Sequence, residues 1–114
     1  MRKKLTLEEQ LTQAFYAFNL AESDFHSAEN DYCKAEMAYQ ESWREYNQAF
    51  YEYVRFGTME YYDKQHMASE TMAYRIKKAN EAKLNHKLAL CKFRKAKKLY
   101  EKLKRKQDKQ LDRN

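Results

Sequence analysis

Residues 11–56 read LTQAFYAFNLAESDFHSAENDYCKAEMAYQESWREYNQAFYEYVRF, and this stretch decides the fold. A small residue recurs at every seventh position, and a large residue follows each small one by four positions. The small series is Ala14, Ala21, Ala28, Ala35, Ser42 and Ala49, and the large series is Phe18, Phe25, Tyr32, Tyr39, Tyr46 and Tyr53. Spacing that alternates between three and four residues is typical of a coiled-coil seam, because it keeps one stripe of a helix facing a partner. The small residues allow two helices to approach closely only where the partner supplies bulk.

The second half of the chain carries the complementary series. When residues are paired so that their numbers sum to 114, large faces small at most levels: Ala14 with Tyr100, Phe18 with Ala96, Ala21 with Phe93, Phe25 with Ala89, Ala28 with His86, Tyr32 with Ala82, Ser42 with Met72, and Tyr46 with Ala68. The exceptions are Leu11 with Leu103, Ala35 with Ala79, Ala49 with Gln65, and Tyr39 with Arg75, the last favouring a cation–π contact. The sequence therefore predicts an all-α fold, a long antiparallel two-helix coiled-coil hairpin with an alanine-rich, close-packed seam.

The mirror point of this pairing is residue 57, and Gly57 is the only glycine in the chain. Glycine is favoured just past a helix end, where φ turns positive, and Thr58 can cap the next helix. We therefore predict one domain over residues 1–114, with helices at about 6–56 and 59–108, a turn at 57–58 and a frayed basic tail at 109–114. Thr6 to Glu9 fits a capping box at the start of the first helix. One alternative stays open, a single helix through Gly57 that pairs with a second copy, since a glycine inside a helix costs only about 1 kcal/mol.

Composition agrees with long helices, because the chain has no proline and its apolar residues are ordered in period. Residues 1–56 hold 6 Lys and Arg against 10 Asp and Glu, whereas residues 57–114 hold 17 against 7. No apolar run approaches the roughly 20 residues that span a bilayer, and no apolar segment follows the basic N-terminus as in a signal peptide. We therefore expect a cytoplasmic protein with no membrane partner. The pairing keeps Cys33 and Cys91 about 15 Å apart along the helices, which predicts free thiols.

Catalytic and cofactor signatures are missing from the sequence. One glycine cannot build a phosphate loop, a dinucleotide fingerprint or a nucleophile elbow. His26, His66 and His86 are scattered, and Asp63 with His66 forms a single acidic-x-x-His pair where a di-iron bundle needs two. We expect no enzymatic activity, no metal, no cofactor and no small-molecule substrate.

Several large side chains fall outside the seam, and a thin helix pair cannot bury them itself. They predict contact with a second copy, giving a four-helix bundle, or with a different protein. The candidate protein-binding residues are Phe15, Trp43, Phe50, Tyr51, Tyr61 and Tyr62. The function we expect is that of a non-enzymatic interaction module, an adaptor or inhibitor that binds a larger assembly through aromatic and charged faces of a helical rod. An inhibitor encoded by a phage or mobile element is one class of protein that fits a chain of this kind.

The end of the second helix is strongly basic. The candidate residues for binding nucleic acid or an acidic protein are Lys95, Lys97, Lys98, Lys102, Lys104, Arg105, Lys106 and Lys109. In a hairpin the basic N-terminus returns beside them, and clustered cations bind phosphates independently of sequence. Sequence-nonspecific binding of nucleic acid through this end is therefore the alternative function.

Overall fold

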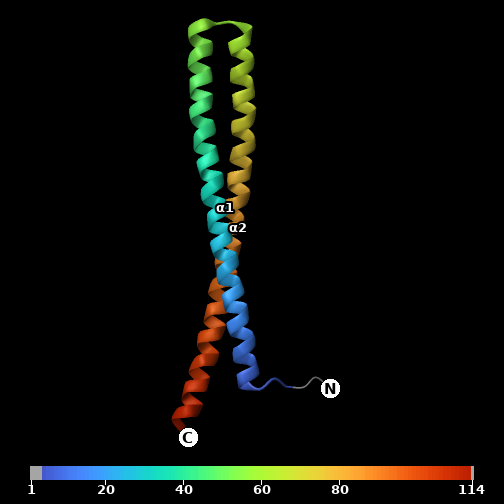
Figure 1. Cartoon of the computed structure of the whole chain (residues 1–114), viewed down its shortest axis with the longest axis vertical. Coiled ribbons are helices and arrows are strands. Elements are labelled where there is room, and N and C mark those ends of the chain that lie inside the picture. The colour runs from blue at the N-terminus through green and yellow to red at the C-terminus, as the bar shows by residue number, and fades with distance from the viewer. Residues whose placement is uncertain (1–3, 114) are drawn as a thin grey trace. The chain divides into compact units, whose positions relative to one another are not determined.

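The computed structural model describes residues 4–113, which form two helices joined by a two-residue connection (Figure 1). α1 covers Leu7–Phe56 and α2 covers Met59–Arg113. Over the described residues the chain is an all-α helical hairpin, as predicted. α2 differs from the prediction at its end, because it continues to Arg113 rather than stopping near residue 108. Residues 1–3 of the predicted basic N-terminus lie outside the described residues.

Both ends of α1 have the local chemistry that the sequence predicts, an N-cap at Thr6 and a glycine with positive φ just past the last turn. The backbone N–H of Glu9 donates to Thr6 Oγ1 at 3.1 Å, so Thr6 is the N-cap of α1. At the connection, Gly57 has a φ of 63° and its N–H donates to the carbonyl of Tyr53 at 2.8 Å. A left-handed residue closed by such a bond ends a helix, and glycine adopts this conformation without steric cost. The alternative of one helix continuous through Gly57 is therefore wrong.

The chain divides into two compact units, each of which contains part of both helices. The described part of the first, here called the terminal unit, is residues 4–28 with residues 86–113. The second, here called the turn unit, is residues 29–85 and contains the connection. Each unit is an antiparallel helix pair.

In the terminal unit the seam holds a small core and a ladder of aromatic rings. Leu11, Ala14 and Leu103 are buried, and Leu7 and Tyr100 pack against them. The ladder alternates between the helices, and the distances between neighbouring ring centroids are Tyr100–Phe18 5.7 Å, Phe18–Phe93 5.5 Å, Phe93–Phe25 5.7 Å and Phe25–His86 5.2 Å. Phe18 and Phe25 of α1 thus each lie between two rings of α2, at the level of the alanine that the register places opposite them. This arrangement confirms the predicted pairing in this unit.

In the turn unit the seam contains a polar contact. Ser42 is the most buried residue, with 1% of its surface exposed, and its hydroxyl donates to the carbonyl of Ala38 at 3.1 Å. Arg75 Nη1 donates to Ser42 Oγ at 2.8 Å and to the same carbonyl at 3.1 Å. The register correctly brings Arg75 to this level of α1, but the guanidinium uses hydrogen bonds rather than the predicted stacking on Tyr39. The reason is that the small Ser42 leaves room in the seam and also supplies an acceptor.

Candidate interaction surfaces

One group of half-exposed aromatic residues in the turn unit is a row of three rings on α1, here called the aromatic stripe: Trp43, Tyr46 and Phe50. Residues three, four and seven apart lie on one side of a helix, so their rings can stack. The centroids of Trp43 and Tyr46 are 5.9 Å apart and those of Tyr46 and Phe50 are 6.4 Å apart, with interplanar angles of 17° and 23°. Trp43 is 49% exposed and Phe50 is 47% exposed. The stripe therefore offers solvent two large rings that a third, half-buried ring holds in place.

A second aromatic group, here called the turn cluster, surrounds the connection and consists of Tyr53, Phe56, Tyr61 and Tyr62. The rings of Phe56 and Tyr61 stack at 4.9 Å, and Tyr62 meets Tyr53 edge-on at 5.6 Å. The Arg55 guanidinium lies 5.4 Å from the centre of the Phe56 ring. These ring contacts join the two helices, because Tyr53 and Phe56 lie on α1 whereas Tyr61 and Tyr62 lie on α2. The turn cluster thus closes the end of the seam, and it leaves two rings half-exposed, Phe56 at 51% and Tyr62 at 45%.

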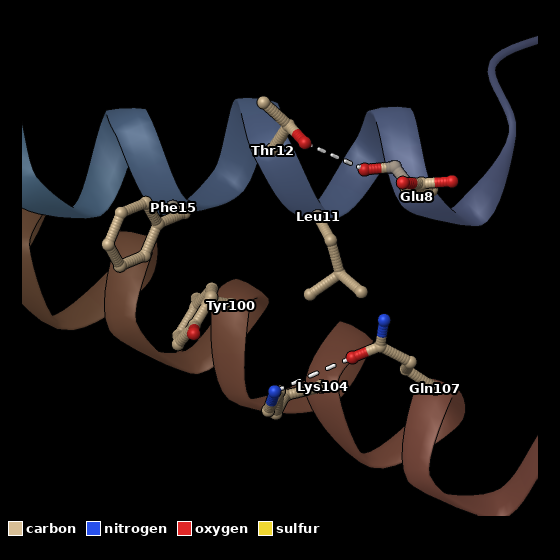
Figure 2. Close-up of a pocket in the computed structure, with 7 residues that line it drawn as sticks. All are labelled: Glu8, Leu11, Thr12, Phe15, Tyr100, Lys104 and Gln107. Carbon is tan, nitrogen blue, oxygen red and sulfur yellow. Dashed lines mark hydrogen bonds between the residues drawn. The ribbon is translucent and has the colours of Figure 1, made fainter. Parts of the chain in front are cut away.

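The remaining two aromatic candidates join neither group. Phe15 belongs to the terminal unit, where its ring is tilted against Tyr100 with the centroids 5.6 Å apart. Figure 2 shows these two rings beside Leu11, which points from α1 toward α2 in a shallow hollow that Lys104 also lines. Tyr51 comes two residues after the seam residue Ala49, about 200° round the helix, so it lies on the outer face of α1.

One member of the aromatic stripe was not among the predicted site residues. Tyr46 was assigned only to the seam, where it is indeed half-buried. Its spacing of three residues from Trp43 and four from Phe50 is the signal that could have shown it stacking with both. Of the six predicted protein-binding residues, the structure therefore brings Trp43 and Phe50 together through Tyr46.

The basic candidates all lie on α2 in the terminal unit, and all eight are exposed. Five of them, here called the basic line, are spaced alternately three and four residues apart: Lys95, Lys98, Lys102, Arg105 and Lys109. The same spacing defines the seam residues Ala96, Tyr100, Leu103 and Gln107, but the basic line is displaced from them to the outer face of α2. Four of the five, with Glu101 and Lys106, line one shallow surface hollow. The hydrophobic seam thus positions a straight row of cations on the side of α2 that faces away from α1.

The three other basic candidates lie beside this line or closer to the seam. Lys104 Nζ lies 3.5 Å from Gln107 Oε1, next to the hollow of Figure 2, and Lys106 borders the hollow of the basic line. Lys97 directly follows the seam residue Ala96. Among residues 4–113, none of the eight cations forms an ion pair with a carboxylate within 4.0 Å, whereas ion pairs do join Lys64 to Glu60 and Lys78 to Glu81.

Cys33 and Cys91 are free thiols, as predicted, and both are exposed. In residues 4–113 no group of three or more His, Cys, Asp or Glu side chains is arranged to hold a metal ion, and His66 instead lies 3.2 Å from Glu70 within α2. Neither helix, over the same residues, contains a stretch long and apolar enough to cross a membrane.

Comparisons with known proteins add no assignment. No protein-family model matches the chain, and neither the curated proteins nor the solved structures include one with significant similarity to it.

Proposed function

We propose that this chain is a non-enzymatic interaction module, an adaptor or inhibitor that binds a larger protein through the aromatic stripe. The observation that supports this most is the pair of half-exposed rings, Trp43 and Phe50, both stacked on Tyr46. Tryptophan and tyrosine dominate the residues that carry binding energy at protein interfaces. The cytoplasm, where free thiols persist, is the compartment that we propose for this activity.

Burial of the exposed rings of the stripe in a partner's surface supplies binding free energy. An aromatic side chain has roughly 150–250 Å² of surface, so a half-exposed ring leaves about 100 Å² to be covered. At about 25 cal/mol per Å², each of the two exposed rings can contribute about 2.5 kcal/mol on burial. Because the rings are already stacked, a partner pays little conformational entropy to order them.

A second copy of the chain is the competing occupant of the same stripe. Two hairpins packed through such a surface would form a four-helix bundle. Light scattering after size exclusion distinguishes the two cases, since Trp43→Ala should convert a stripe-mediated dimer to monomer. A dimer that depends on Trp43 would replace the adaptor proposal with self-assembly.

The direct test compares variants in a quantitative pull-down from the native source. Trp43→Ala and Phe50→Ala remove stripe rings, whereas Tyr74→Ala removes an exposed ring on α2 that lies under the Lys78 ammonium, outside the stripe. We expect the stripe variants to reduce recovery of a specific protein by at least tenfold, which corresponds to about 1.4 kcal/mol. Equal recovery with all three variants would remove the stripe from the proposal.

A further inference from the structure

We infer that the basic line binds the phosphodiester backbone of a nucleic-acid duplex, without reading its sequence. This activity goes beyond the proposed protein contact, because it uses a different unit of the molecule and a different chemistry. The line runs from Lys95 to Lys109, which is about 21 Å of helix at 1.5 Å per residue. Five cations in one row match a ligand whose charge is itself repeated along a line.

Arg105 Nε donates to the carbonyl of Glu101 at 3.3 Å, but the fold does not account for the row of cations as a whole. Basic residues stabilise a helix end through its dipole, but that effect is confined to the last turn, and the line begins 18 residues before Arg113. The acidic residues of α1 cannot neutralise the line, because it lies on the outer face of α2. Like charges four residues apart, such as Lys98 with Lys102 and Arg105 with Lys109, destabilise a helix. A bound polyanion would relieve this repulsion.

Charge around the line is strongly one-sided. Residues 86–112 contain 11 Lys and Arg against 3 Asp and Glu. Two of the three acids, Glu101 and Asp108, lie beside the line rather than on it, seven residues apart. The third, Asp112, stands at the next position of the same spacing, so the row of cations ends at Lys109, and Glu101 is the one acid that borders the hollow.

The composition of the hollow favours phosphate over an acidic protein surface. The residues that line it are all charged, with no aromatic or aliphatic anchor: Lys98, Glu101, Lys102, Arg105, Lys106 and Lys109. Protein interfaces are built around such anchors and are depleted in lysine, whereas backbone contacts to nucleic acid are made chiefly by Lys and Arg. Binding of single strands generally adds aromatic rings on which bases stack. No aromatic residue occupies a position of the line, so a duplex is the ligand that fits it best.

The test is fluorescence anisotropy with the full chain and a labelled duplex of about 20 base pairs of arbitrary sequence, long enough to span the line. If each cation of the line neutralises one phosphate, the slope of log K against log salt concentration should be about −4.5. Affinity should then fall roughly 500-fold between 50 and 200 mM salt. Binding that hardly changes over this range would overturn the inference.

A pair of charge-matched variants separates the line from net charge. Lys98→Gln/Lys102→Gln/Arg105→Gln removes three cations from the line, and we expect the slope to become shallower by about 2.7. The control, Lys34→Gln/Lys77→Gln/Lys87→Gln, removes three exposed cations elsewhere. Circular dichroism should show the same helix content for both variants. Equal weakening by the two variants would show that only overall charge matters and would refute the line as a site.

Two competitors identify the chemical class of ligand. Poly-glutamate carries negative charge without phosphate, and we expect it to displace the duplex only at a large excess of charge. Displacement at equal charge would assign the line to acidic proteins instead, and tighter binding of a single strand of the same length would overturn the choice of a duplex. Trp43→Ala should leave duplex binding unchanged, so failure of the aromatic-stripe proposal and failure of this one are distinguishable.

Discussion

Exchanging a large and a small residue across the seam tests the packing of the terminal unit directly. Phe25 is half-buried, and its ring contacts Phe93 at 5.7 Å and His86 at 5.2 Å. Removing a fully buried phenylalanine costs about 3–5 kcal/mol, and a half-buried one with two ring contacts should cost about 2–3 kcal/mol. Ala89 lies at the same level of α2, so Ala89→Phe alone should overpack the seam by about 1–3 kcal/mol.

The double variant Phe25→Ala/Ala89→Phe moves the bulk from one helix to the other and leaves the seam filled. We expect its free energy of unfolding to lie within about 1 kcal/mol of the wild type, whereas independent effects would sum to about 3–6 kcal/mol. Urea denaturation followed by circular dichroism at 222 nm measures all four proteins. This coupling is the direct consequence of pairing large with small at each level.

The control for this exchange places the new ring one heptad away. Phe25→Ala/Ala96→Phe has the same composition as the double variant, but Ala96 lies opposite Phe18. Its two effects should add, because the gap at residue 25 stays open and the level of Phe18 becomes overfilled. Rescue of equal size by Ala96→Phe, or an additive Phe25→Ala/Ala89→Phe variant, would refute level-by-level packing.

Three further experiments test the helix end at Gly57, the polar contact of the seam and the N-cap of α1. Gly57→Ala should destabilise the hairpin by about 1–2 kcal/mol through its φ of 63° alone, since an added Cβ meets no atom within 4 Å; a thermal melt that does not shift would contradict this. Ser42→Ala and Arg75→Met should show a coupling of about 1–2 kcal/mol in a double-mutant cycle, because each removes the same 2.8 Å hydrogen bond. Additive losses would mean that this bond contributes nothing. Thr6→Ala should cost about 1 kcal/mol by removing the acceptor of the Glu9 N–H, whereas Thr6→Ser should cost almost nothing. Urea titrations that rank these two variants equally would exclude the cap.

The architecture was predictable because one signal repeats. The heptad series fixes which face of each helix is covered, and the lone Gly57 marks the reversal, so the antiparallel pairing and the connection follow from the sequence. The end of α2 was not predictable in the same way. Residues 104–113 are mostly Lys, Arg, Gln and Leu, which are good helix formers, and no glycine or proline stops them. Apolar content predicts a seam, but it does not predict where a charged helix ends.

The sequence predicted which residues form the candidate surfaces, but it did not predict how their side chains are arranged. Exposure of Trp43 and Phe50 followed from their places outside the seam, but the stacking through Tyr46 depends on side-chain rotamers that a heptad pattern does not determine. The basic end was evident from composition. To tell the cations of the outer row from those that flank it, the seam residues of α2 had to be known first. The contact of Arg75 with Ser42 needed distances, because a guanidinium at this position can either stack or donate.

The irregular positions of the seam give the hairpin a defined register. A seven-residue repeat does not determine the register by itself. If one helix moves along the other by seven residues, large residues still lie opposite small ones at most positions. The two-residue connection at Gly57 opposes such a slip, since α1 and α2 would have to lose a turn of helix to allow it. Arg75 opposes it independently: after a slip its guanidinium would meet Ala35, which has no side-chain acceptor, in place of Ser42. A polar pair inside an alanine seam therefore contributes to the choice of one register over its neighbours, as buried polar residues do in other coiled coils.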